Sequence, residues 1–156
     1  MDWKLGSGES VVDRHNSHMH GDLENLVREA LQHTSSTGRK FIIEEVDFGR
    51  IIGETVCVTT GTGDQILFAQ RPGRFGLSRF VVNRKPESCS KMVVILKKAE
   101  EDNCYVLITA FIGHKPEPEP WDRNATVRSR EFWSSRALVW GAEPVVAGTE
   151  TASCPW

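Results

Sequence analysis

Residues 91–112 read KMVVILKKAEEDNCYVLITAFI. Two runs rich in β-branched and aromatic residues, 91–99 and 104–112, flank the polar stretch from Glu100 to Asn103. Such runs are typical of β-strands. A connection this short joins antiparallel neighbours, because parallel strands need a long crossover. The stretch therefore predicts a β-hairpin within an antiparallel sheet.

The residues before this hairpin extend the same pattern. Further strand-like runs, separated by turn-forming residues, are predicted at 40–48, 50–60, 65–70 and 77–83. Ahead of them lies an amphipathic segment whose apolar side chains recur at helical spacing. That stripe consists of Leu23, Leu26, Val27, Ala30 and Leu31. The segment predicts a helix that packs on the sheet.

A second helix is predicted near the end of the chain. In residues 129–141, the side chains of Phe132, Trp133, Ala137 and Trp140 recur at spacings of three and four. The expected fold class is therefore α+β, with an N-terminal helix, an antiparallel sheet of four to six strands, and a C-terminal helix. We expect a loose segment at 1–18, a single domain at 19–141 and a tail at 142–156.

The bulk composition narrows the classes of protein. The chain has 156 residues, of which 39% are hydrophobic, and this suffices for one core. No run of about 18 apolar residues is present, so no membrane span or secretory signal is expected. The four cysteines have no CxxC spacing, which favours reduced thiols and a cytoplasmic location. A pI of about 6.2 argues against a general nucleic-acid coat protein.

Residues 71–85 form a basic block without a carboxylate. Its cations are Arg71, Arg74, Arg79, Arg84 and Lys85. Positive charges this close together attract phosphate and repel one another, so the block favours an anion-binding wall. The alternative is a solvated strand edge that charge protects from aggregation.

Alternation along 104–112 sorts the side chains of that strand into two faces. One face is expected to hold Cys104, Val106, Ile108, Ala110 and Ile112 as core. The other face is expected to hold Tyr105, Leu107, Thr109 and Phe111. On that face the Thr109 hydroxyl could bind a phosphate and the aromatic rings could stack on bases. Alternatively, Thr109 reflects only the β-propensity of threonine.

Histidines cluster before the first helix. The run His18-Met19-His20 is followed by Leu23 where a zinc site would require another histidine, so no metal or cofactor is expected. An imidazole such as that of His20 can take and give a proton near neutral pH. Together with arginines, it would suit cleavage of RNA through attack by the ribose 2′-hydroxyl. The alternative is that His20 is only a loop residue.

The order of these features resembles the barnase–EndoU–colicin–RelE-like superfamily of small ribonucleases. The matching pieces are HMHGDLENLVREAL, GLSRFVV, YVLITAF and the closing EFWSSRALVW. The resemblance implies a metal-independent endoribonuclease, toxin-like, that acts on RNA and is restrained by a neutralising protein partner. It implies His20 as the acid or base, Arg79 as the charge stabiliser and Thr109 as the phosphate ligand.

The resemblance also assigns supporting residues. Arg74 and Ser78 would support the three catalytic residues, and Tyr105 would orient a base. His114 and Lys98 are the candidates for a second proton-transfer group, and Arg71 belongs to the substrate-binding set.

Two other functions remain open. The chain could be a non-catalytic module that binds nucleic acid or protein through residues 71–85, with an affinity that falls as salt rises. It could also be a protein-interaction domain in which Trp121, within a proline-rich loop, serves as an exposed anchor.

Overall fold

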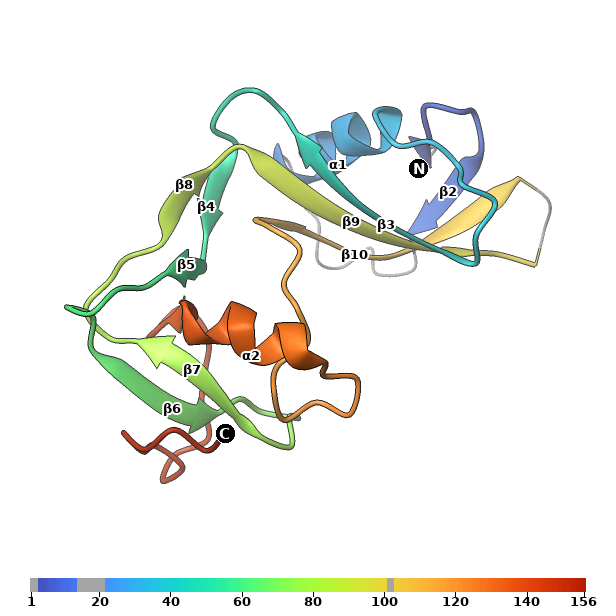
Figure 1. Cartoon of the computed structure of the whole chain (residues 1–156). Coiled ribbons are helices and arrows are strands. Elements are labelled where there is room, and N and C mark those ends of the chain that lie inside the picture. Colours follow the sequence, from blue (N-terminus) through green and yellow to red (C-terminus); the bar gives the residue numbers. More distant parts are fainter. Residues whose placement is uncertain (1–2, 14–21, 101–102) are drawn as a thin grey trace. The chain divides into compact units, whose positions relative to one another are not determined.

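The computed structural model describes residues 3–13, 22–100 and 103–156, which form two compact units (Figure 1). Unit 1 consists of Met1–Gly53 and Ser88–His114, and unit 2 of Glu54–Glu87 and Lys115–Trp156. The chain leaves unit 1 through β4 (Gly53–Thr55) and returns through β8 (Glu87–Cys89), and these two strands pair. No helix within the described ranges is long and apolar enough to cross a membrane.

Unit 1 is a five-stranded sheet with one helix, α1 (Asp22–Gln32), packed on one face (Figure 1). In sheet order its strands are β1 (Trp3–Lys4), β2 (Ser10–Asp13), β10 (Cys104–Ile112), β9 (Lys91–Lys98) and β3 (Phe41–Asp47). Neighbouring strands are antiparallel except β2 and β10, which are parallel. The α+β class, the first helix and the 91–112 hairpin are confirmed.

The core of unit 1 lies between α1 and the sheet. Val27 and Leu31 of the helix are fully buried against Met92, Val94 and Leu96 of β9. The apolar stripe of the sequence therefore faces the sheet, and this burial is the main force that holds the helix in place.

A β-bulge divides β10. Leu107 pairs with Leu96, but the next pair along the ladder is Thr109 with Ile95, so Ile108 is an extra residue. An extra residue reverses the alternation beyond it. Ala110 therefore joins Leu107 on the face that α1 covers, and Thr109 points to the other face.

The expected division of residues 104–112 into two faces is thus wrong. Tyr105 and Leu107 belong to the core of unit 1, whereas Thr109 and Phe111 lie on the opposite face of the sheet. Simple alternation failed because the bulge has no strong signal in the run VLITAF.

Unit 2 contains a four-stranded sheet and the second helix, α2 (Val127–Ser134). In sheet order the strands are β5 (Cys57–Thr59), β11 (Arg136–Val139), β7 (Leu77–Val81) and β6 (Ile66–Gln70). β11 runs parallel to β7, and the other pairs are antiparallel. The buried rings of Phe80 and Trp133 are at the centre of one of its apolar clusters.

The predicted helix at 129–141 is corrected to a shorter helix and a strand. A capping box between Thr126 and Ser129 starts α2, and the helix ends at Ser134. Residues 136–139 instead form β11, in which Ala137 and Leu138 are buried between two neighbouring strands. Pairing on both edges outweighs the helical spacing of the aromatic residues, because tertiary contacts override local propensity.

The chain contains more strands than the four to six expected. The described residues hold eleven strands in three sheets, and four of these strands have only two or three residues. Part of the expected loose segment forms β1 and β2, where Trp3 and Val11 are buried. Within the expected tail, Thr151 exchanges backbone hydrogen bonds with Phe68 at 2.8 Å.

Candidate functional site

Within the described residues of unit 1, α1 packs on one face of the sheet and no helix of this unit packs on the other, which is here called the open sheet face. It is defined by the side chains of β3, β9 and β10 that point away from α1. Two cross-strand rows form its middle, Phe41–Lys97–Val106 and Ile43–Ile95–Thr109. Directly opposed residues in an antiparallel ladder share a face, so these six side chains lie together.

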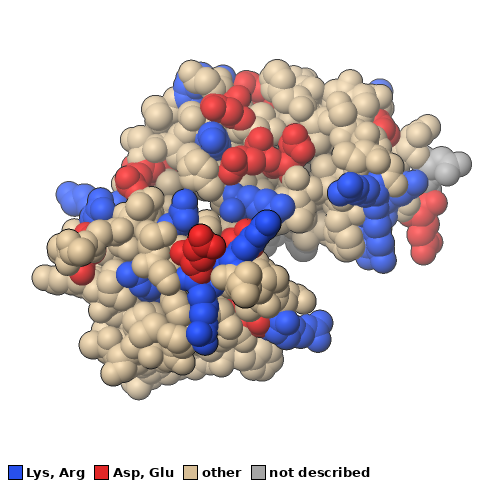
Figure 2. Space-filling view, in the orientation of Figure 1, with Lys and Arg blue, Asp and Glu red and all other residues tan. Residues whose placement is uncertain are grey.

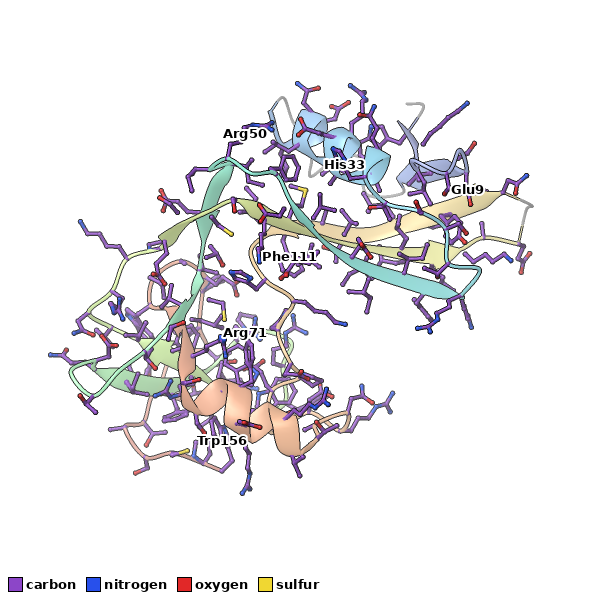
Figure 3. The ribbon with its side chains drawn as sticks, turned by 45° about the horizontal axis from the view of Figure 1, so that its top comes forward. Glu9, His33, Arg50, Arg71, Phe111 and Trp156 are labelled. Atoms are coloured by element: carbon purple, nitrogen blue, oxygen red, sulfur yellow. The ribbon has the colours of Figure 1, made fainter. Side chains whose placement is uncertain are left out.

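The open sheet face is unusually apolar for an exposed surface. Phe41 is 50% exposed and Ile43 is 43% exposed, and the bulge residue Ile108 is 40% exposed. Thr109 is also exposed. Phe111 lies on the same strand two residues further on (Figure 3) and is half-buried. Val93, which points to the same face, is fully buried, so the exposed apolar side chains are those around Phe41, Ile43 and Ile108. Such a group of exposed apolar side chains favours a binding surface, because burying it in a complex is favourable.

Charged side chains lie at both ends of this face. At one end, the ammonium groups of Lys40 and Lys97 lie 5.8 and 6.0 Å from the centre of the Phe41 ring. At the other end, Glu45 pairs with Lys91 at 3.8 Å, and its second oxygen lies 3.3 Å from Nδ1 of His114. The His114 side chain is 58% exposed, so a ligand can reach its ring.

Several of the groups that phosphodiester chemistry uses are distributed along this face. The Glu45 carboxylate can hold the His114 ring in one orientation, and the free ring nitrogen can transfer a proton. The Thr109 hydroxyl can donate to a phosphate oxygen. Between β3 and β10 lies one strand, so Glu45 and Phe111 are roughly 10 Å apart across the sheet.

The other residues predicted in the 98–114 region do not share this face. Tyr105 is 2% exposed, and its hydroxyl is 2.6 Å from that of Ser36. Lys98 is paired with Tyr105 in the ladder and lines, with Glu9 and others, a separate pocket of about 310 Å³. His20 lies outside the described residues, so its predicted role stays a prediction.

In unit 2, Arg71 is held by three side chains. Its Nη2 donates to Glu119 at 2.5 Å, its Nε to Ser78 at 3.0 Å, and its Nη1 to Glu143 at 3.4 Å. Arg71 is 18% exposed, Glu119 is 8% exposed and Ser78 is fully buried. The geometry gives Arg71 and Ser78 a structural task within unit 2 (Figure 3).

Arg79 is also engaged. Its Nη1 donates to the Thr60 hydroxyl and to the carbonyl oxygen of Arg136, both at 2.9 Å. Burial lowers the pKa of the Arg79 guanidinium from its ordinary value. Arg79 belongs to unit 2 and Thr109 to unit 1.

Carboxylates from other segments pair with two of the five cations of the basic block, Arg71 and Arg84. Arg84 donates to Asp64 at 2.9 Å, and this hydrogen bond, followed by one from the Gly61 backbone, lowers the pKa of the Asp64 carboxyl. With Arg71 paired as well, only Arg74 and Lys85 in the block lack an ion pair or side-chain hydrogen bond to another described residue. Figure 2 shows acidic and basic side chains intermixed on the visible surface. The cations of residues 71–85 therefore do not form one continuous surface of unpaired positive charge.

Glu45, Lys91 and Lys97 were not among the predicted site residues. The signal that could have found Glu45 is its place in β3, two residues from Ile43 and four from Phe41, which puts all three on one face.

Trp121, the expected exposed anchor, is half-buried and packs on Gly76. A Cβ added at Gly76 would lie 2.1 Å from Cγ of the Trp121 ring.

We expect Gly76→Ala to lower the free energy of unfolding by about 1–3 kcal/mol, because the Trp121 indole must move. The measurement is urea unfolding followed by tryptophan fluorescence. The matched control is Gly63→Ala, whose Cβ would meet nothing within 4 Å; an equal loss in both variants would contradict the packing argument.

No group of three or more histidine, cysteine, aspartate or glutamate side chains converges as a metal site in residues 3–13, 22–100 and 103–156. The thiols of all four cysteines are free, and burial raises the pKa of Cys57 to about 11, which makes it a poor nucleophile.

No known family model, curated protein or solved structure matches this chain.

Proposed function

We propose that the chain is an endoribonuclease that cuts RNA without a metal ion, by attack of the ribose 2′-hydroxyl on the adjacent phosphate. The observation that carries the proposal is the open sheet face. There an exposed threonine hydroxyl stands among apolar and aromatic side chains, with lysines and a carboxylate–imidazole pair at the ends. Surfaces that bind RNA through a sheet combine these elements, since rings stack on bases and cations bind phosphates.

Each group has a defined role in the reaction. The His114 imidazole takes the proton of the 2′-hydroxyl, and the oxygen attacks phosphorus. The 5′-oxygen then leaves and takes a proton from a second acid, the role that His20 would fill, so the products are a 2′,3′-cyclic phosphate and a 5′-hydroxyl. Thr109 donates to a non-bridging phosphate oxygen, and Lys91 lies at the end of the face where the His114–Glu45 pair is found.

The resemblance to small ribonucleases implies His20 as an acid or base, which would act beside His114, and Arg79 as a charge stabiliser. It also implies a neutralising protein partner. These parts of the proposal depend on that resemblance and are tested separately from the open sheet face. Without His20 or an equivalent acid, the face would bind RNA and cut it slowly.

The experiment is incubation of the protein with tRNA and total RNA in EDTA. We expect discrete cleavage products that end in a 2′,3′-cyclic phosphate, and no cut where the 2′-hydroxyl is replaced by hydrogen. Cuts in that deoxy substrate would eliminate the reaction as written. RNA that is bound but left intact would favour the alternative, a non-catalytic binding module.

The site assignment is tested by Thr109→Val, which keeps the shape and removes the hydroxyl. We expect cleavage to slow roughly 10- to 100-fold, the loss that follows from one hydrogen bond to a charged group. The matched control is Thr59→Val, an exposed strand threonine of unit 2, for which the rate should not change. Equal rates in both variants would remove Thr109 from the site.

A further inference from the structure

The loop between β6 and β7 presents a fully exposed aromatic ring. Phe75 is 98% exposed, which is extreme for a phenylalanine. The loop around it is held in shape. The Arg74 backbone N–H donates to the Arg71 carbonyl at 3.1 Å, Gly73 adopts φ +77°, and the Gln70 side chain donates to the Arg74 carbonyl. The ordered loop therefore holds the Phe75 ring in contact with water, and this exposure of apolar surface is unfavourable in free energy.

A second segment of unit 2 completes a pocket beside this ring. The pocket has a volume of about 470 Å³ and is lined by Gly73, Arg74, Phe75, Trp121, Asp122, Arg123 and Asn124. Residues 119–125 form successive turns, closed by hydrogen bonds from Asp122 to the Glu119 carbonyl and from Ala125 to the Asp122 carbonyl, both 2.9 Å. Backbone hydrogen bonds thus hold the segment that contributes Trp121, Asp122, Arg123 and Asn124 to the pocket. A pocket of this size suits a small planar ligand group.

Two guanidinium groups in this pocket have no acidic partner within the described chain. The side chains of Arg74 and Arg123 are exposed and form no ion pair there, in contrast to Arg71 and Arg84. The carboxylate of Asp122 accepts a hydrogen bond from the Asn124 backbone at 2.8 Å. An exposed ring and two unpaired guanidiniums in one pocket are complementary to a base that carries phosphates.

We propose that this pocket binds single-stranded RNA, with an unpaired base stacked on Phe75 and the neighbouring phosphates bound by Arg74 and Arg123. The inference deepens the proposed ribonuclease function, on which its choice of RNA rests, and names the substrate class as unpaired RNA. Bases inside a duplex are stacked on both faces, so none is available to the Phe75 ring. The protein loop between β6 and β7 also cannot enter the deep, narrow major groove of double-stranded RNA.

The test measures binding apart from cleavage. Anisotropy of a short labelled oligouridylate is recorded with the Thr109→Val, His114→Ala protein, so that the probe stays intact. Phe75→Ala in that background is expected to weaken binding roughly 5- to 100-fold, the range for one lost base–aromatic stack. Val127→Ala, which alters another nearly fully exposed apolar residue (89% exposed), should leave the affinity unchanged.

The arginines are tested through salt dependence. Replacing both Arg74 and Arg123 with glutamine should make the slope of log affinity against log salt shallower by about 1.4, because each phosphate contact with a single strand contributes about 0.7. Arg130→Gln, at an exposed arginine of α2, is the charge-matched control and should affect the slope less.

The outcomes separate this inference from the proposed function. Unchanged affinity in Phe75→Ala, or equal affinity for a duplex of the same length, overturns the pocket as a site for unpaired RNA. That result would also be expected if the ring served a protein partner. If the wild-type protein binds RNA in a manner that depends on Phe75 but cuts no RNA, the result supports the pocket as an RNA-binding site and contradicts the ribonuclease function.

Discussion

Replacing His114 with alanine is expected to slow RNA cleavage by about 10²–10⁴-fold, the usual contribution of a positioned acid or base. His114 lies two residues after the end of β10, its Nδ1 lies 3.3 Å from the Glu45 carboxylate, and its side chain is 58% exposed. A histidine held on one nitrogen and open at the other is equipped for proton transfer. The measurement is the single-turnover rate on a short RNA, so that product release does not mask the chemical step.

A matched histidine is available at His33, directly after α1 (Figure 3). It is exposed, and we expect His33→Ala to cleave at the wild-type rate. Glu45→Gln should cause a smaller loss than His114→Ala, because the ring remains while its orienting charge is removed. A His114→Ala protein that cuts as fast as wild type would end the role assigned to the Glu45–His114 pair.

Glu119→Ala is expected to lower the free energy of unfolding by about 3 kcal/mol. The carboxylate is 8% exposed and accepts from Arg71, which is itself 18% exposed. Removing one partner leaves a largely buried cation without its nearest counter-charge. The measurement is urea unfolding followed by the fluorescence of the unit 2 tryptophans.

The control is Glu143→Ala, which removes a 46% exposed carboxylate from the same guanidinium. We expect a change below about 1 kcal/mol, as for a solvent-exposed ion pair. The double variant Arg71→Met, Glu119→Leu should recover part of the loss, since apolar side chains can replace a buried pair. Equal losses in Glu119→Ala and Glu143→Ala would contradict the burial argument.

The sequence predicted those features that depend on neighbours along the chain. The stripe of α1 gave the helix and its buried face, and the two runs at 91–112 gave the central hairpin. It could not predict β11, because residues 136–139 become a strand only where two other strands pair with them. The short strands β1 and β2 were hidden for the same reason, since their polar surroundings give no period.

The candidate site was predictable only in part. Thr109 and His114 were found from residue type and position. The bulge at Ile108 determines on which face of the sheet Thr109 lies. It leaves the hydrophobic pattern of the sequence unbroken, so it could not be predicted. The pairing of Arg71 with Glu119 and of Arg84 with Asp64 joins residues 48 and 20 positions apart. A count of charges within residues 71–85 could not register either partner.

Strand β11 has a consequence for how this protein is made. It lies in the interior of the unit 2 sheet, between β5 and β7, although it is the last strand to leave the ribosome. Until residue 139 is synthesised, β7 is paired only with β6 and has one unpaired edge, and β5 has no partner strand in this sheet. If translation stops before residue 139, the truncated chain keeps unpaired strands. We therefore expect it to aggregate or to be degraded, even when every residue of unit 1 has been translated.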